Sequence, residues 1–518
     1  MPLKHNGVTP AIILVLLLRG TDMVNKHQSV NFYLQLITRL ILLGVLFASI
    51  SDEISSPLFA KQTSSNLAKP AQFTTYLGGT SVDDCDGIAV DALGSLYLAC
   101  HSNSKDFPGL KGGKDSADID AFVAKLDPRT GKLVYTTRLG GSGYDAAIAV
   151  EVGNDGSVLV AGYTTSSDFH TTDDAIQRTF GGAGDIFLAK LNSEGLIEYS
   201  TYLGGNDQDV CRGMVVDSNE RIYLGGVTLS ENFPGVRGLD LRKNAAKGDA
   251  FIASFGLREK GSLRLALFGG GGLDEIRGIA LDASGNIYAS GVTHSIEFPV
   301  KSSAQDKLNG VSDAFLAKLR ITDLCLVYSK LVGGSGEEVG TGLAIDRTGN
   351  PYLTGSTTSS DFPVSDSAFQ RQYAGGKDAF VAKLNAAGTG FLYSTYIGGT
   401  GEDAAGFSGS MDVDSEGNAW VIGLTKSLNF PIIPGIQTAY GGGEWDSFAI
   451  ALDPSGSRLK FSSYYGGDAL DVMEGITLAL DGSVWTTGLT ASRNILAVNA
   501  LQKNYNGGQF DAWIVKIY

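Results

Sequence analysis

The stretch GLAIDRTGNPYLTGSTTSSDFPVSDSAFQRQYAGGKDAFVAKLNAAGTGFLYSTYIGG, residues 342–399, decides the fold. It contains four short apolar runs, each about five to seven residues long, that are rich in Val, Ile, Leu, Tyr and Phe. Gly, Asp, Asn, Ser and Pro bound every run, and Asp346–Asn350 has the composition of a hairpin turn. Helical spacing is absent, so the stretch predicts one unit of four antiparallel strands.

The same unit occurs seven times along the chain. A Gly-Gly doublet follows the last apolar run of each copy, and successive doublets are 62 to 68 residues apart. The first glycines of the doublets are Gly78, Gly140, Gly204, Gly269, Gly333, Gly398 and Gly466. A second marker of the DAFVAKL type also appears seven times, starting at Asp120, Asp185, Asp249, Asp313, Asp378, Asp446 and Asp511. Two markers thus agree on a repeat architecture.

Closure of the seven units into a ring explains both the pattern and its ends. Runs such as FVAKL and IAVD are apolar on both faces, so each small sheet needs cover on both sides. A radial ring supplies that cover, whereas a linear stack needs atypical end repeats. The repeats open with a fourth strand, about residues 72–77, and stop with a third, about residues 511–517. Pairing these two strands removes two exposed edges. We therefore predict an all-β, seven-bladed β-propeller of four-stranded antiparallel blades over residues 72–518.

Four motifs together resemble the SBBP-type bacterial β-propeller repeat family: YSTYLGG, GIAVD-x-x-G-x-x-Y, G-x-T-x-S-x-D-F-P and DAFVAKL. The resemblance implies seven blades, usually in exported or surface proteins, and brings no catalytic residue set that could be transferred. Local departures include RLGG and AIAV in the second copy, ASF in the third, and a longer GTGEDAAGFSGS in the sixth.

Composition points to a globular protein whose partners are not nucleic acids. The chain has 69 glycines, 18% charged residues and a net charge of -15. Phosphate binding depends on clustered cations, and no run of Lys or Arg is present. We expect a monomer that needs no cofactor.

The first 71 residues lie outside the repeats and predict export. LILLGVLFASI, residues 40–50, has the length of a signal-peptide core, and a start at Met23 places charged, apolar and small residues in the usual order. We predict an export segment over residues 1–51 and a linker over residues 52–71. An uncleaved anchor over residues 32–50 is the alternative and would be the chain's one membrane contact. The expected location is extracellular, at the cell surface or periplasmic.

Four cysteines are too few for a disulfide framework. Cys85 and Cys100 would face each other if their strands form a hairpin, but small buried fillers are the preferred interpretation. Cys211 and Cys325 sit in separate units without an evident partner. No CxxC or His-rich spacing indicates zinc.

An acid precedes the first strand of every unit, and symmetry would gather these acids at one mouth of the channel. They are Asp83, Asp145, Asp209, Asp274, Glu338, Asp403 and Asp471. One interpretation is an oxygen-rich ring that holds Ca²⁺ or another hard cation. The other, which we prefer, is that each acid accepts hydrogen bonds from its own loop.

A unique binding site needs residues that are not repeated, so candidates lie where the units differ. These are the loop from Lys111 to Lys114, the basic stretch 237–247 with Arg242 and Lys243, the insertion 401–410, and Glu444 with Trp445.

Three functions follow as hypotheses. The first is a non-catalytic binding or scaffold module for a protein or surface partner, because no G-x-S-x-G elbow or metal-ligand motif is present. The second is a hydrolase or lyase in which His101, His170 or His294 acts with an acid. The third is a carbohydrate-binding propeller that stacks sugars on Trp445 or on the loop tyrosines Tyr373, Tyr440 and Tyr505.

Overall fold

A computed structural model describes residues 73–110, 118–242, 248–257, 259, 261–301, 307–433 and 436–518. The chain divides into two units, Met1–Asn66 and Leu67–Tyr518, and every strand belongs to the second. The predicted export segment, the start at Met23 and the linker lie outside the described residues. Within the described ranges, no helix is long and apolar enough to cross a membrane.

Seven sheets form the second unit, and each is one blade. Blade 1 contains β2 (Asp83–Val90), β3 (Leu96–Ser102), β4 (Asp120–Asp127) and β5 (Lys132–Leu139). Blade 2 contains β6 (Asp145–Val152), β7 (Val158–Thr164), β8 (Asp185–Leu191) and β9 (Ile197–Leu203). Blade 3 contains β10 (Asp209–Val216), β11 (Arg221–Thr228), β12 (Val236–Arg242), β13 (Asp249–Gly256) and β14 (Arg264–Gly269). Blade 4 contains β15 (Asp274–Leu281), β16 (Asn286–Thr293), β17 (Asp313–Arg320) and β18 (Leu326–Val332).

The remaining three blades continue the series. Blade 5 contains β19 (Glu338–Ile345), β20 (Pro351–Thr357), β21 (Asp378–Leu384) and β22 (Phe391–Ile397). Blade 6 contains β23 (Asp403–Ala405), β24 (Met411–Val413), β25 (Ala419–Thr425), β26 (Asp446–Leu452) and β27 (Leu459–Tyr465). Blade 7 contains β28 (Asp471–Leu478), β29 (Val484–Thr490), β30 (Asp511–Lys516) and β1 (Phe73–Leu77).

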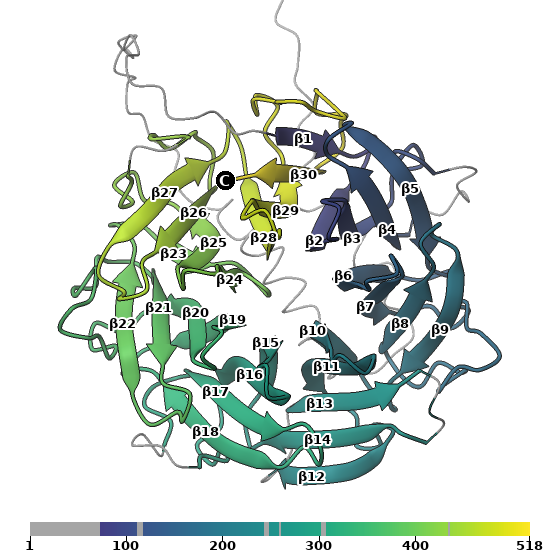
Figure 1. Ribbon diagram of the computed structural model, residues 1–518, viewed down its shortest axis with the longest axis horizontal. Coiled ribbons are helices and arrows are strands. Elements are labelled where there is room, and N and C mark those ends of the chain that lie inside the picture. Colours follow the sequence, from purple (N-terminus) through teal and green to yellow (C-terminus); the bar gives the residue numbers. More distant parts are fainter. Residues whose placement is uncertain are drawn as a thin grey trace, which may run out of the picture. The chain divides into compact units, whose positions relative to one another are not determined.

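The seven blades form a closed ring around a central channel (Figure 1). The inner strands contact one another in the order β2, β6, β10, β15, β19, β24, β28 and back to β2. In blade 7, the N-terminal strand β1 runs antiparallel to β30, with Phe73 opposite Lys516 and Leu77 opposite Ala512. The last blade is therefore built from both ends of the repeat region. The structure confirms the predicted all-β, seven-bladed propeller.

Two blades depart from the predicted four simple strands. Part of the basic stretch 237–247 forms β12, which lies parallel to β14 and makes blade 3 five-stranded. In blade 6, residues Gly406–Ser410 separate β23 from β24, so the insertion interrupts the inner strand rather than preceding it. Both are additions to a unit whose remaining strands keep the common order.

Every uninterrupted inner strand carries a β-bulge at the same place. One residue per strand has no partner in the ladder, as between Cys85 and Gly87 or between Cys211 and Gly213. The bulged residues are Asp86, Ile148, Arg212, Arg277, Thr341 and Glu474. The insertion of blade 6 falls at the equivalent position. Residue type at the bulge differs between blades, although its backbone setting is repeated.

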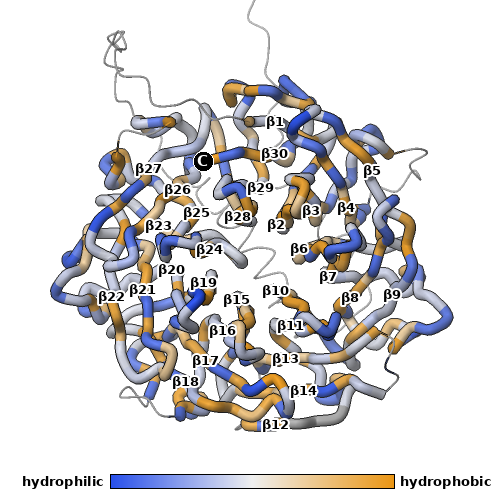
Figure 2. Tube along the Cα trace, in the orientation of Figure 1, coloured by the Kyte–Doolittle hydropathy of each residue, from blue (hydrophilic) through white to orange (hydrophobic). Residues whose placement is uncertain are grey.

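The core lies between neighbouring blades. Figure 2 shows hydrophobic stretches along the strands of every blade. A typical cluster joins Tyr97 and Val123 of blade 1 to Val160 and Phe187 of blade 2. The phenylalanine of each D-F-P motif packs on the next strand, as Phe169 stacks on Phe187 at 4.8 Å. Both faces of each sheet are thus covered, as their apolar sequences predict.

Candidate functional site

The acid at the start of each inner strand forms a latch within its own blade junction. Asp209 is fully buried and accepts hydrogen bonds from the backbone N–H of Gly205 (2.7 Å) and the hydroxyls of Thr228 (2.5 Å) and Ser230 (2.8 Å). Gly205 belongs to the Gly-Gly doublet, and the two hydroxyls belong to the T-x-S motif after the second strand. The acid therefore ties the loop that enters the blade to the loop that leaves its second strand.

The same latch occurs in all seven blades. Each acid accepts from a doublet glycine and from the hydroxyls of the T-x-S position, which is S-x-S in blade 1. Among the described residues, none of the acids Asp83, Asp145, Asp209, Asp274, Glu338, Asp403 and Asp471 belongs to a group of three or more converging metal-ligating side chains. The structure thus gives each acid the hydrogen-bonding role within its own loops and does not gather the acids around one ion.

A second buried carboxylate faces each latch. A Cβ on Gly204 would lie 2.5 Å from Oδ1 of Asp185 and 2.9 Å from Oδ2 of Asp209, so only glycine fits between them. Burial raises the pKa of Asp185 to about 6. Burial also raises the pKa of Asp209 to about 7, and the nearby Asp185 adds to that shift. The junction between blades 2 and 3 therefore holds two carboxyls whose pKa values are both raised.

Two exposed residues follow the T-x-S position of each blade, and the chemistry of the first varies among the blades. We call these seven first residues the loop-tip ring: Lys105, Ser167, Glu231, Ile296, Ser360, Leu428 and Arg493. Their backbone setting is repeated, because the serine before each tip bonds to a latch acid. Their chemistry is not repeated, since the ring includes cations, an anion, serines and two large apolar side chains. A rigid loop with a variable tip is a usual place for recognition.

Several exposed apolar residues lie at this end of the strands. Ile296 and Leu428 expose 69% and 79% of their surface. Val311, just before β17, and Leu496, just after the latch loop of blade 7, expose 59% and 75%. Exposed apolar side chains with polar ones around them are typical of a protein-binding surface.

Two groups of interacting charged side chains involve the inner strands. In the first, the fully buried Glu275 of β15 accepts from Arg212 Nε of β10 (2.6 Å) and from Arg277 (3.0 Å). Burial by itself would raise the pKa of Glu275, but the charges of Arg277 and Arg212 outweigh it and lower the pKa to about 2. This group joins blades 3 and 4 through a charge-compensated network.

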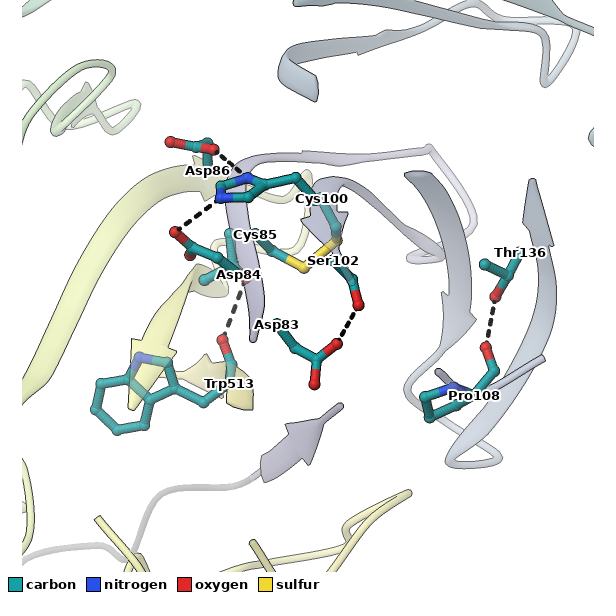
Figure 3. Close-up of a disulfide and its surroundings, with 11 residues drawn as sticks. Asp83, Asp84, Cys85, Asp86, Cys100, Ser102, Pro108, Thr136 and Trp513 are labelled. Carbon is teal, nitrogen blue, oxygen red and sulfur yellow. Dashed lines mark hydrogen bonds and ion pairs between the residues drawn. A yellow bond between two sulfur atoms is a disulfide. The ribbon is translucent and has the colours of Figure 1, made fainter. Parts of the chain in front are cut away.

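The second group lies in blade 1 (Figure 3). Asp84 and Asp86 of β2 lie on the two sides of the imidazole of His101, which is on β3. His101 Nε2 is 3.6 Å from Asp84 Oδ2, and Nδ1 is 3.1 Å from Asp86 Oδ2. All three side chains are buried, and one ligand atom from each lies within 4.8 Å of the others. In the part of the chain that the structure describes, this is the one such group of three.

A disulfide joins the two strands of this group, which corrects the preferred interpretation of its cysteines. Cys85 and Cys100 are bonded to each other and are fully buried (Figure 3). The ladder places them directly opposite each other on β2 and β3. Burial is as expected, but the two residues are not independent fillers. Cys211 and Cys325 are free, as the sequence suggests.

Replacing the disulfide is expected to lower the free energy of unfolding by about 3 kcal/mol, the loop-entropy value for a loop of about 15 residues. The double variant Cys85→Ala/Cys100→Gly carries the pair that blade 2 has at this register, Ala147 and Gly162. Urea denaturation measures the change. Cys211→Ala serves as the control, because burial raises the pKa of that thiol to about 12 and keeps it unreactive. Equal stability of the double variant and the wild type would contradict the prediction.

The structure places the predicted unit-specific residues apart from one another. Lys111, Lys114 and Lys243 lie outside the described residues. Arg242 ends β12 and pairs with Asp240 (2.8 Å) and Asp249 (3.6 Å).

The other two predicted binding residues, Glu444 and Trp445, are neighbours in the sequence but differ in exposure. Trp445 is only 2% exposed, and the ammonium of Lys426 lies 4.2 Å from the centre of its ring. Glu444 lies 3.6 Å from the same ammonium. The ring of Trp445 is thus buried beneath the Lys426 ammonium, and its role in binding stays a prediction.

The aromatic and imidazole candidates also separate by environment. Tyr373, Tyr440 and Tyr505 each donate to a backbone carbonyl of their own loop and contact a buried tyrosine of the blade. Because the same contacts recur in three blades, we interpret these tyrosines as residues that stabilise their loops. His170 and His294 are exposed, whereas His101 alone of the three candidates contacts carboxylates.

The comparisons with known proteins agree with the architecture. A family model described as a beta-propeller repeat, SBBP, matches residues 72–108, 198–234 and 327–363. Each match spans the last strand of one blade and the first two of the next. The chain thus contains SBBP-type beta-propeller repeats, as the motifs predict.

A curated protein similar to this chain is the Regulatory protein FlaEY of Caulobacter vibrioides, which is 25% identical over 452 residues. The match covers 81% of this chain but only 46% of that protein, so the chain spans less than half of its length. Two similar solved structures are the polysaccharide lyase Uly1 and a quinohemoprotein alcohol dehydrogenase from Pseudomonas putida HK5. Each is 11% identical, with TM-scores of 0.39 and 0.38. They cover 91% and 86% of this chain, and 94% and 76% of their own chains. Neither likeness says what this chain acts on.

Proposed function

We propose that this protein is an exported or cell-surface, non-catalytic binding module that holds a protein or surface partner on its loop-tip ring. The proposal rests on the different environments of the residues within each T-x-S-x loop. The threonine and serine are bound to a buried acid, whereas the next residue is exposed and differs from blade to blade. The seven loops are held in the same way, and their tips carry side chains of several chemical kinds. This combination suits recognition of one large partner.

Apolar exposure favours a protein among the surface partners. Ile296 and Leu428 occupy tip positions at which blades 2 and 5 carry Ser167 and Ser360. Large exposed apolar side chains at a position that tolerates serine are unnecessary for folding and costly in water. The word "regulatory" in the name of the Caulobacter relative is in keeping with a partner-binding role.

The two alternatives receive less support from particular residues. A lectin function would need stacking platforms, but Trp445 is buried and the hydroxyl of Tyr440 is engaged in its own loop. Of the three histidines considered for an enzyme, His101 is the one that contacts carboxylates, and it is only 6% exposed. Turnover of a glycan or peptide panel that His101→Gln abolishes would favour the enzyme.

Substituting the apolar loop tips is expected to weaken partner binding at least tenfold, a loss of about 1.4 kcal/mol. The variant Ile296→Ser/Leu428→Ser copies blades 2 and 5, so it keeps the loop backbone intact. Fluorescently labelled full chain is titrated onto envelopes isolated from the producing cells, and the dissociation constants are compared. Protease pretreatment should remove the binding if the partner is a protein, whereas periodate pretreatment should remove it if the partner is a glycan.

The control is Leu93→Ser/Leu480→Ser, which removes two exposed leucines from turns at the opposite ends of the inner strands. Their side chains are 73% and 88% exposed, so the change in apolar surface is comparable. Equal weakening by both variants would contradict the loop-tip ring as the binding surface. Absence of saturable binding by the wild type would contradict a surface-binding function altogether.

A further inference from the structure

We propose that Asp84, Asp86 and His101 bind one divalent transition-metal ion between β2 and β3 of blade 1. The proposal goes beyond partner binding on the loop-tip ring and does not depend on it. It rests on the donor set, on a comparison of blade 1 with the other six blades, and on the disulfide beside the site.

The donor set has the composition and spacing of a metal site. Two carboxylates and one imidazole offer three ligand atoms that all lie within 4.8 Å of one another. Because Asp84 faces Nε2 and Asp86 faces Nδ1 of the ring, one carboxylate has to turn before all three side chains share an ion. Asp84 and His101 are directly opposite in the β2–β3 ladder, and Asp86 is the bulged residue of β2. The bulge brings two acids that are two positions apart in the sequence to the same imidazole.

The other blades show that the fold does not need these polar residues. The ladder pair Asp84 and His101 corresponds to Ala146 and Tyr163 in blade 2, and to Val210 and Val227 in blade 3. Burying ionisable groups where hydrophobic pairs suffice costs free energy.

Blade 4 provides the contrasting case of a structural acid at this register. Glu275 occupies the position of Asp84 there, and it is held by Arg212 and Arg277. Arg277 is the bulged residue of blade 4, whereas blade 1 has Asp86 at that position. One blade thus combines its buried acid with arginine, and the other combines its buried acid with a second acid and an imidazole. The second combination has the two carboxylates and the imidazole that a metal ion could bind.

The disulfide fixes the backbone of all three residues. Asp84 and Asp86 flank Cys85, and His101 follows Cys100. At the position of Cys100, the blades 2, 3, 4, 5 and 7 carry a glycine, whose added Cβ would lie about 2 Å from a backbone carbonyl oxygen. Blade 1 differs from these five blades, because it has the disulfide-bonded Cys100 at this position. Holding two strands covalently beside a ligand set reduces the conformational freedom lost when an ion binds.

The donor atoms select the class of ion. Imidazole nitrogen suits Zn²⁺ and its neighbours, carboxylate oxygen suits Mn²⁺ as well, and Ca²⁺ takes six to eight oxygens. A mixed set of one nitrogen and two carboxylates therefore favours Zn²⁺ or Mn²⁺ over Ca²⁺. Three protein ligands leave coordination positions for water or another group.

Calorimetric titration of the chelator-treated full chain with Zn²⁺ alone, and separately with Mn²⁺ alone, tests the proposal. We expect one equivalent to bind, and to bind more tightly at pH 8 than at pH 6, because a coordinating imidazole must be deprotonated. His101→Gln and Asp84→Asn should each weaken binding at least tenfold. The ion should raise the unfolding midpoint of the wild type, since it binds only the folded site.

Two further variants keep the result decisive. Asp84→Val/His101→Val installs the pair of blade 3, so it should fold and bind no ion at this site. His170→Gln removes an exposed imidazole and should leave binding unchanged. Failure of the wild type to bind one equivalent of either ion would overturn the proposal. Binding that survives the valine pair, or that depends on His170, would overturn it as well.

Discussion

Raising the pH from 5 to 8 is expected to lower the thermal midpoint of unfolding by roughly 5 °C or more. The cause is the buried carboxyl pair at each blade junction. Burial raises the pKa of Asp209, Asp378 and Asp446 to about 7, and that of Asp185 and Asp471 to about 6. Like charges within a pair add to the shift, as Asp471 does for Asp446.

The sign follows from proton binding in the two states. The unfolded carboxyls release their protons near the usual value of 3.8, whereas the folded ones keep theirs up to about pH 6 to 7. The stability that these protonated groups contribute is therefore complete below pH 3.8 and is lost as the pH rises through the folded values. Scanning calorimetry at intervals between pH 5 and 8 measures the change. A midpoint that is constant or rises over this range would rule the explanation out.

One variant isolates a single junction. Asp446→Asn should stabilise the protein at pH 8 by about 1 kcal/mol and should flatten the pH dependence, because a neutral amide then faces Asp471. Its amide oxygen can still accept from the backbone N–H of Gly441. The matched control is Asp155→Asn, since Asp155 is exposed and the hydroxyl and backbone N–H of Ser157 lower its pKa. That control should leave the difference between pH 5 and pH 8 unchanged.

Repetition explains why so much of the architecture could be predicted from the sequence. Seven copies of one pattern predict the same four strands. A strand whose sequence pattern is weak in one blade can therefore be recognised from the other blades. The partners of the latch acids could be recognised from the repeats in the same way, because the hydroxyl residues follow each acid after a nearly constant number of residues. Thr228 and Ser230 follow Asp209 by 19 and 21 residues, and Thr490 and Ser492 follow Asp471 by the same offsets. Constant offsets indicate local bonding within a unit, not a shared ion.

Features that occur in one blade alone could not be predicted with the same certainty. The cysteine pair required the register of β2 against β3, and a bulge at Asp86 shifts that register by one residue. The cluster of Asp84, Asp86 and His101 has no compact spacing in the sequence, because its members meet only across the ladder. The sequence signal for this cluster was that blade 1 departs from the repeat at positions that face each other across β2 and β3. Asp84 and His101 replace apolar residues of other blades, and Cys100 replaces a glycine.

Removal of the last strand is expected to abolish cooperative folding of the whole ring. A chain that ends at Gly508 lacks β30, so β1 loses its only partner in the sheet and β29 pairs with β28 alone. Trp513 and Ile514 are 2% and 0% exposed, and loss of side chains of this size costs about 3 to 5 kcal/mol each. A total of this order matches the roughly 5 to 15 kcal/mol of an entire folded domain. Circular dichroism and calorimetry should therefore show no wild-type transition.

A peptide added in trans separates failure of closure from general damage. The gap left in blade 7 has strand edges on both sides, so the synthetic peptide QFDAWIVKIY, residues 509–518, should insert and restore the transition. The same peptide with Ile514→Asp should not, because that side chain is fully buried. A truncated chain that keeps the wild-type midpoint without peptide would mean that β30 does not close the ring. Rescue by the native peptide alone would show that the two ends of the repeat region hold the seven blades together, since β1 is the one described strand that joins a blade from a distant part of the chain.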